Sequence, residues 1–184
     1  MNRIRWAVDT LDPGPGDLLL EIGCGSGAAV SAVCERLAGG RIVAIDRSAS
    51  AIGRAERRNA EQVAAGRAVL RVLDLEELEP ADVLRGRERF DKVFAMNVNL
   101  FWVRSPRREL DLIRRLLRPG GALYLFYGYG GASPPASAAG VPGALTGHLT
   151  EAGLDVEVRT AGSLAAVVAT PRSGPIPGDP KAPG

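Results

Sequence analysis

The feature that most constrains this chain is a short apolar segment, residues 17–22 (DLLLEI), that runs directly into glycines at positions 23, 25 and 27. A continuous apolar run of this length is typical of a strand buried on both faces of a parallel sheet. The glycines allow a tight turn and let a ligand approach the backbone without interference from a Cβ atom. A helix predicted from residue 28 directs its free N–H groups at the same point, which favours a carboxylate or a phosphate there.

Turn residues divide the rest of the chain into alternating strands and helices. Further strands are predicted at 41–45, 68–73, 90–96 and 122–127, and helices at 28–37, 48–65, 81–86, 106–118 and in a segment ending near 153. Two last strands, 155–160 and 164–170, flank Gly162-Ser163, a dipeptide that suits a type II′ hairpin. Strands joined by helices imply right-handed crossovers. We therefore expect an α/β fold, a three-layer αβα sandwich with a seven-stranded, mostly parallel sheet and a C-terminal antiparallel hairpin strand.

Two aspartates stand where the second and third predicted strands end. Asp46 follows the second strand and Asp74 follows the third. Because ligands of doubly wound sheets bind at the carboxyl ends of the strands, both aspartates are expected beside the glycine turn. A carboxylate at Asp46 can accept hydrogen bonds from two ribose hydroxyls. Asp74 can accept one from the amine of an adenine, with Leu75 beside the ring, so the pattern indicates a ligand shaped like adenosine.

The sequence resembles the class I, seven-stranded S-adenosylmethionine-dependent methyltransferases. The resemblance rests on the segments 21–27 (EIGCGSG), 44–47 (AIDR), 73–75 (LDL), 90–97 (FDKVFAMN) and 117–124 (LRPGGALY). It implies S-adenosylmethionine as the cofactor, with its methionine end at the glycine turn, its ribose at the second strand end and its adenine at the third. The cofactor-binding residues implied are Glu21, Gly23, Cys24, Gly25, Gly27, Asp46, Arg47, Asp74, Leu75 and, beside the reacting centre, Asn97.

Candidate contacts for the methyl acceptor follow the fourth and fifth strands. Asn99 is a candidate for orienting a polar acceptor, and Phe101 or Trp102 for walling the pocket or contacting the cationic sulfonium. Tyr127 is a candidate for lining the same pocket. In the alternative interpretation, Phe101 and Trp102 pack under the following helix and Tyr127 belongs to the core. We expect a small-molecule acceptor.

No residue stands out as a catalytic base, and no metal ligands are predicted. Methyl transfer permits this, because orientation of the two reactants supplies much of the rate enhancement. A base is needed only where the acceptor arrives protonated at a high pKa. Asp91 comes early in its strand and has no clustered carboxylates around it in the sequence, and His148, the only histidine, is expected at the surface of the last helix.

Three alternatives remain at this stage. Gly23, Gly25 and Ala28 also match the dinucleotide fingerprint G-x-G-x-x-A, although Glu21, the closing hairpin and the lack of a separate substrate domain favour a methyl donor. A relative that binds the cofactor without turnover would fit the short 128–140 connection. An RNA methyltransferase would use the arginines between 104 and 118, but Glu109 and Asp111 dilute that charge, so nucleic acid is not the expected partner.

Composition sets the expected size and location. A chain of 184 residues fits one domain, which we assign to residues 1–171, with a flexible Pro- and Gly-rich tail at 172–184. The formal net charge of +2 does not by itself imply a nucleic-acid partner. Cys24 and Cys34 are interpreted as reduced thiols. Lacking a signal-peptide core and a run long enough to span a bilayer, the protein is expected in the cytoplasm without a membrane partner. The short loops suggest an open pocket that a partner, or the second subunit of a homodimer, closes.

Overall fold

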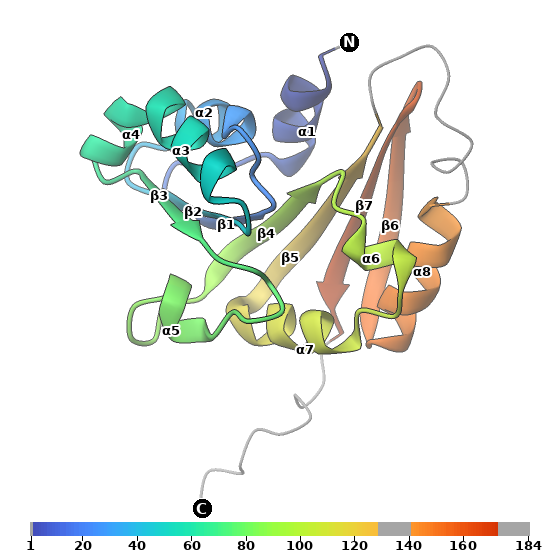
Figure 1. The fold of residues 1–184 in the computed structure, drawn as a ribbon. Helices are drawn as coiled ribbons and strands as arrows, with labels where there is room; N and C mark the ends of the chain where they lie inside the picture. The colour runs from blue at the N-terminus through green and yellow to red at the C-terminus, as the bar shows by residue number, and fades with distance from the viewer. Residues whose placement is uncertain (1, 129–140, 173–184) are drawn as a thin grey trace, which may run out of the picture.

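The computed structural model describes residues 2–128 and 141–172. Its centre is a single seven-stranded sheet in the order β3-β2-β1-β4-β5-β7-β6, in which β7 alone runs opposite to the other six strands (Figure 1). The strands are β1 (Leu18–Ile22), β2 (Arg41–Asp46), β3 (Ala68–Val72), β4 (Phe90–Met96), β5 (Leu117–Tyr127), β6 (Leu154–Ala161) and β7 (Leu164–Pro171). The predicted α/β architecture and its antiparallel hairpin strand are confirmed.

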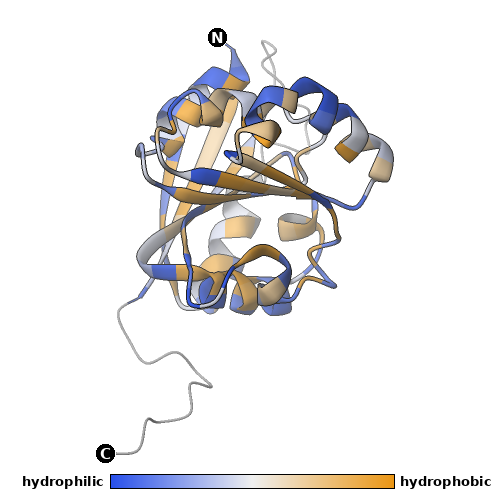
Figure 2. Cartoon of the chain, turned by 90° about the vertical axis from the view of Figure 1, so that its left-hand side faces the viewer, coloured by the Kyte–Doolittle hydropathy of each residue, from blue (hydrophilic) through white to orange (hydrophobic). Residues whose placement is uncertain are grey.

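Helices cover both faces of this sheet and make the outer two layers of the sandwich. One face carries α1 (Arg3–Leu11), α2 (Ala28–Cys34) and α3 (Ala49–Arg58), with the short α4 (Ala60–Ala64) after them. The other face carries α5 (Pro80–Val83), α6 (Leu100–Val103), α7 (Arg107–Leu116) and α8 (Val141–Glu151). Seen edge-on, the strands form an apolar layer between two helical layers whose outer faces are largely hydrophilic (Figure 2).

The apolar runs of the central strands fill the core on both sides of the sheet. Consecutive residues of a strand point to opposite faces, so Leu19 and Phe94 pack with α1, α2 and α3, whereas Leu20 and Val93 pack with the other helices. All four side chains are at most 1% exposed. Because β1, β2, β3 and β4 run parallel, their carboxyl ends lie together at one edge of the sheet.

The helix predicted over residues 48–65 is broken at Asn59 into α3 and α4. The Nδ2 atom of Asn59 donates to the carbonyl oxygens of Ala55 (2.8 Å) and Gly27 (3.0 Å), and its Oδ1 accepts from the Ser31 hydroxyl (2.6 Å). The side chain is completely buried, and a buried amide that makes three hydrogen bonds stabilises the local structure instead of straining it. Asn59 thus fastens α3 to the end of the glycine turn.

Two helices were not expected from the sequence, and several predicted helices end early. Helix α1 begins after Asn2, whose side chain accepts from the backbone N–H groups of Ile4 and Arg5, and its Trp6 packs edge-on against Phe126 of β5 with ring centroids 5.9 Å apart. Helix α6 is a single turn between β4 and α7. Helices α2 and α5 both end three residues before their predicted ends, at Cys34 and Val83. Helix α7 ends at Leu116 instead of 118, because β5 begins at Leu117, five residues before the predicted start.

The C-terminal hairpin has the two-residue loop that the sequence predicts. Ala161 pairs with Leu164, and Gly162 between them has a φ of 59°, as the first central position of a type II′ turn requires. The backbone N–H of Arg172 donates to the carbonyl oxygen of Gly153, and its guanidinium forms an ion pair with Asp155. The connection 129–140 and residues 173–184, most of the predicted tail, lie outside the described residues. No described helix is long and apolar enough to cross a membrane.

Candidate cofactor site

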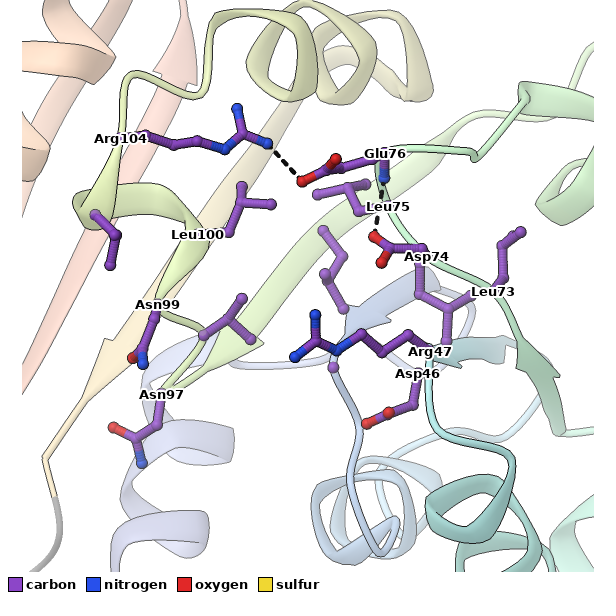
Figure 3. A pocket seen from close by; sticks show the side chains of 15 residues that line it. Asp46, Arg47, Leu73, Asp74, Leu75, Glu76, Asn97, Asn99, Leu100 and Arg104 are labelled. Carbon is purple, nitrogen blue, oxygen red and sulfur yellow. Dashed lines mark hydrogen bonds and ion pairs between the residues drawn. The ribbon is translucent and has the colours of Figure 1, made fainter.

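A cavity of about 490 Å³ opens where β1, β2, β3 and β4 end (Figure 3). Its volume lies in the range of small-molecule and cofactor pockets. Its walls combine apolar side chains with several acids, arginines and amides. The lining residues are Ile22, Gly23, Ile45, Asp46, Arg47, Leu73, Asp74, Leu75, Glu76, Asn97, Val98, Asn99, Leu100, Val103 and Arg104.

The glycine turn is held by the end of β2 and contributes Gly23 to the cavity wall, whereas Cys24, Gly25 and Gly27 do not line the cavity. The backbone N–H groups of Gly23 and Cys24 both donate to the carbonyl oxygen of Ile45, at 2.8 and 3.0 Å. A Cβ atom on Gly23 would lie 2.8 Å from the Val98 side chain, whereas one on Gly25 would meet nothing within 4 Å. Gly23 is therefore required for packing against the loop after β4, and Gly25 keeps an open space in front of the backbone.

Asp46 connects the glycine turn to the start of α3. Its Oδ2 accepts from the N–H of Gly25 (2.9 Å), and its Oδ1 accepts from the N–H of Ser48 (2.9 Å). An ionised carboxylate has about four acceptor positions, so both oxygens retain capacity for further donors such as hydroxyl groups. The two backbone bonds hold the carboxylate in a defined orientation at the cavity wall.

Asp74 and Leu75, which are predicted to frame an adenine, line the cavity after β3, and Arg47, another predicted cofactor-binding residue, lines it after β2. Asp74 accepts from the N–H of Glu76 (3.1 Å), and Leu75 is only 5% exposed while it lines the cavity. Arg47 extends its side chain into the cavity from the end of β2 (Figure 3). An apolar wall next to an acceptor is the arrangement that an adenine ring with its amine would fit.

Glu21 lies beneath the glycine turn and does not line the cavity. Its side chain is 2% exposed, and its Oε2 atom has no hydrogen-bond partner among the described residues. Burial, with a smaller contribution from the negative charge of Asp46, raises the pKa of Glu21 to about 8. The carboxyl group is therefore largely protonated at neutral pH.

This raised pKa predicts a stability that depends on pH. The folded state retains a proton on Glu21 that the unfolded state, with a pKa of 4.5, releases. The stabilisation is thus fully present below about pH 4.5, decreases as pH rises and is lost by about pH 8. We expect the unfolding free energy of Glu21→Gln to rise relative to wild type between about pH 5 and about pH 8 in urea titrations.

The matched control for this experiment is Glu157→Gln. Glu157 is exposed, and its hydrogen bond with Arg159 lowers its pKa. Replacing it should not reproduce the trend. A difference between Glu21→Gln and wild type that is constant across this pH range would show that Glu21 does not carry the predicted proton.

The end of β4 is shaped by Asn97, which has a left-handed φ of 54°. Its side-chain amide donates to the carbonyl oxygen of Gly128 (3.1 Å) and accepts from the N–H of the same residue (3.0 Å). Both functional groups of the amide are therefore used to tie β4 to β5. Asn97 and Asn99 both line the cavity, but the amide of Asn97 holds the backbone, so a direct role toward a ligand stays a prediction.

Two of the three aromatic candidates for acceptor contact, Phe101 and Tyr127, belong to the core. Phe101 is completely buried in the core, in agreement with the alternative interpretation of the sequence. Tyr127 is 7% exposed, and its hydroxyl donates to the carbonyl oxygen of Val98 (3.3 Å). Burial raises the pKa of Tyr127. Neither residue lines the cavity. The side chain of Trp102 lies outside the described residues.

Other candidate groups are also placed by the structure. Cys24 and Cys34 are free and buried, and burial raises the pKa of the Cys24 thiol to about 12. The Nδ1 atom of His148 lies 3.4 Å from the carbonyl oxygen of Phe101, between α8 and α6. Within residues 2–128 and 141–172, no group of three or more histidine, cysteine or acidic side chains is placed to hold a metal ion.

Sequence reasoning missed two residues of the cavity wall that form an ion pair. Arg104 Nη2 lies 2.6 Å from Glu76 Oε1 and 2.6 Å from Glu109 Oε1. In the sequence, Arg104 is part of a basic stretch and Glu76 belongs to no predicted motif. Glu76 could have been predicted from its position, because it comes two residues after Asp74 at the end of the third predicted strand.

Comparison with known proteins supports the same interpretation. A family model described as a methyltransferase domain matches residues 20–123, more than half of the chain, including the glycine turn, Asp46 and Asp74. The chain belongs to this methyltransferase domain family. Together with the strand order, the match identifies a class I S-adenosylmethionine-dependent methyltransferase domain.

Individual relatives are distant. An uncharacterised 37.1 kDa protein in transposon TN4556 of Streptomyces fradiae is 32% identical over 119 residues, which is 64% of this chain, but the matched region spans only 32% of that protein. A SAM-dependent methyltransferase from Aquifex aeolicus has a TM-score of 0.69 and 18% identity over 90% of this chain and 88% of its own. The glycopeptide N-methyltransferase MtfA has a TM-score of 0.68 and 16% identity over 92% and 90% of the two chains. At these identities the solved structures establish the fold alone.

Proposed function

We propose that this chain transfers the methyl group of S-adenosylmethionine to a small-molecule acceptor by direct in-line displacement. The observation that carries the proposal is the cavity at the ends of β1–β4, which brings the glycine turn, Asp46 and Asp74 onto three successive strand ends. Family membership supports the same donor. The cofactor supplies a methyl group on a sulfonium, which is an electrophile that needs no further activation.

The chain's own residues bind and orient the two reactants. Asp46, already oriented by the N–H groups of Gly25 and Ser48, accepts from the ribose hydroxyls. Asp74 accepts from the adenine amine while Leu75 excludes water from one face of the ring. The open space in front of Gly25 fits the approach of the methionine portion to the backbone. Orientation of this kind accounts for much of the rate enhancement of a displacement reaction.

The acceptor side supports a small molecule more than a nucleic acid. A glycopeptide N-methyltransferase of similar fold shares the arrangement of sheet and helices. Of the arginines that would form an RNA-binding face, Arg104 is paired with Glu76 and Glu109, Arg114 donates to the carbonyl oxygen of Ala152, and Arg118 is paired with Asp91. The ion pairs of Arg104 and Arg118 reduce the positive charge available for phosphate contacts.

The test is release of S-adenosylhomocysteine from the purified protein with a panel of amines, phenols, carboxylates and thiols. The proposal predicts turnover with at least one class and little affinity for RNA. Binding of S-adenosylmethionine with no product from any acceptor favours the relative that binds without turnover. RNA binding that falls steeply with salt, together with methylation of RNA, would replace the small-molecule assignment.

A further inference from the structure

One arginine crosses the mouth of the cavity and joins its two walls. The loop after β3 forms one wall with Asp74 and Glu76, and the segment after β4 forms the other with α6. Arg104, directly after α6, reaches across to Glu76, as Figure 3 shows. Among the described residues that line the cavity, no other ion pair is formed between the walls.

This contact extends to the carboxylate that is expected to hold the adenine. The backbone N–H of Glu76 donates to Asp74 Oδ1 (3.1 Å), so Glu76 and Asp74 belong to one turn. A displacement of Glu76 would move the donor that orients the Asp74 carboxylate. Arg104 is therefore connected to Asp74 through two hydrogen bonds, although it does not touch Asp74 itself.

The other partner of Arg104 is a fixed anchor. Glu109, in the first turn of α7, has a side chain that is only 5% exposed, and its Oε2 atom has no partner among the described residues. A buried carboxylate needs its ion-pair partner far more than an exposed one does. Glu109 thus holds the Arg104 guanidinium in place at the cavity edge.

The Glu76 contact itself contributes little to stability. The side chains of Arg104 and Glu76 are 47% and 56% exposed, and exposed ion pairs of this kind stabilise a fold weakly. A contact that adds little stability, yet bridges the two walls of the cavity, is more consistent with a role in shaping the cavity.

We propose that Arg104 is a positioning residue for the cofactor: anchored by Glu109, it holds Glu76, and through Glu76 the Asp74 carboxylate, at the adenine end of the cavity. This inference rests on the proposed function, because it takes S-adenosylmethionine as the ligand. It predicts that Arg104 affects recognition of the adenine amine in particular and not ligand binding in general.

The experiment compares two ligands in a calorimeter, S-adenosylhomocysteine and S-inosylhomocysteine, in which a carbonyl replaces the adenine amine. Wild type should prefer the adenosyl ligand, because a carboxylate accepts from an amine and is repelled by a carbonyl oxygen. Arg104→Gln should bind S-adenosylhomocysteine about tenfold more weakly, the size expected for coupling within a contacting network. Its affinity for S-inosylhomocysteine should change little. The ratio of the two dissociation constants, which measures the preference for the adenosyl ligand, should therefore be smaller in Arg104→Gln than in wild type.

Two further variants separate positioning from folding. Glu76→Gln leaves the Arg104–Glu109 pair intact and should reduce the preference for S-adenosylhomocysteine as Arg104→Gln does. It therefore tests the proposal even where Arg104→Gln fails to fold. Arg159→Gln is the matched control, because Arg159 pairs with Glu157 on the edge strand β6 and its side chain is 46% exposed. This control should bind both ligands like wild type.

The remaining outcomes overturn one claim or the other. Arg104 has no positioning role if Arg104→Gln lowers the affinity for both ligands equally. The same conclusion follows if Arg104→Gln and Glu76→Gln both bind the two ligands like wild type. If wild type itself binds neither ligand, the proposed function fails and this inference fails with it. If wild type binds S-adenosylhomocysteine and both variants keep its preference for that ligand, the proposed function stands and only the inference about Arg104 fails.

Discussion

Replacing Gly27 with alanine is expected to lower the free energy of unfolding by about 2–5 kcal/mol. Gly27 precedes α2 with a φ of 71°, a left-handed conformation that costs a residue with a Cβ about 1–2 kcal/mol. The new Cβ would also lie 2.6 Å from Asn59 Nδ2 and 2.8 Å from the Ala55 Cβ. Relieving that overlap displaces α3 or breaks the buried hydrogen bonds of Asn59, and overpacking of this kind costs about 1–3 kcal/mol.

The measurement is urea unfolding followed by circular dichroism, with Gly53→Ala as the control. Gly53 lies inside α3, and the nearest atom to an added Cβ would be the end of the Arg57 side chain at 3.7 Å. Alanine in a helix interior is favoured over glycine by about 0.5–1 kcal/mol, so the control should be slightly more stable than wild type. A Gly27→Ala protein as stable as Gly53→Ala would contradict the close packing of the turn on α3.

Asp46→Ala should weaken binding of S-adenosylmethionine by about ten- to a hundredfold, measured by calorimetry. Charge-assisted hydrogen bonds contribute about 1.5–3 kcal/mol, and the ribose hydroxyls would lose their acceptor. The substitution also removes the acceptor of the Gly25 and Ser48 N–H groups. The glycine turn then loses its connection to α3, which adds to the loss of affinity.

Asp46→Asn distinguishes these two contributions. The amide keeps the shape of the side chain and one acceptor oxygen but loses the charge, so we expect an affinity between those of wild type and Asp46→Ala. Thermal unfolding of the three proteins reports separately on the turn. A dissociation constant for Asp46→Ala equal to that of wild type would remove Asp46 from the site.

The fold followed from the sequence wherever strands are buried on both faces. β1 lies in a continuous apolar run, and β4 has the predicted ends. The break at Asn59 was missed because it depends on a tertiary partner, the carbonyl oxygen of Gly27, 32 residues away. Helix α1 did have a local signal, since Ile4, Ala7, Val8 and Leu11 recur at helical spacing after Asn2, whereas the four residues of α6 are too few to show a period.

The site was predictable to the extent that it lies at strand ends. Asp46 ends β2, Asp74 and Leu75 come two and three residues after β3, and all three line the cavity. The position of Tyr127 in the core and the bonds of Asn97 to Gly128 depend on how β4 and β5 pair, which no local pattern specifies. The same holds for the Arg104 bridge, whose three members come from separate segments.

The most direct test of the central claim is a calorimetric titration of the purified chain with S-adenosylmethionine and, separately, with NAD and NADP. A methyl-donor cavity predicts micromolar binding of S-adenosylmethionine and no binding of either dinucleotide. Binding of NAD or NADP without S-adenosylmethionine would contradict it, because the glycine turn and Asp46 would then serve the competing dinucleotide fingerprint.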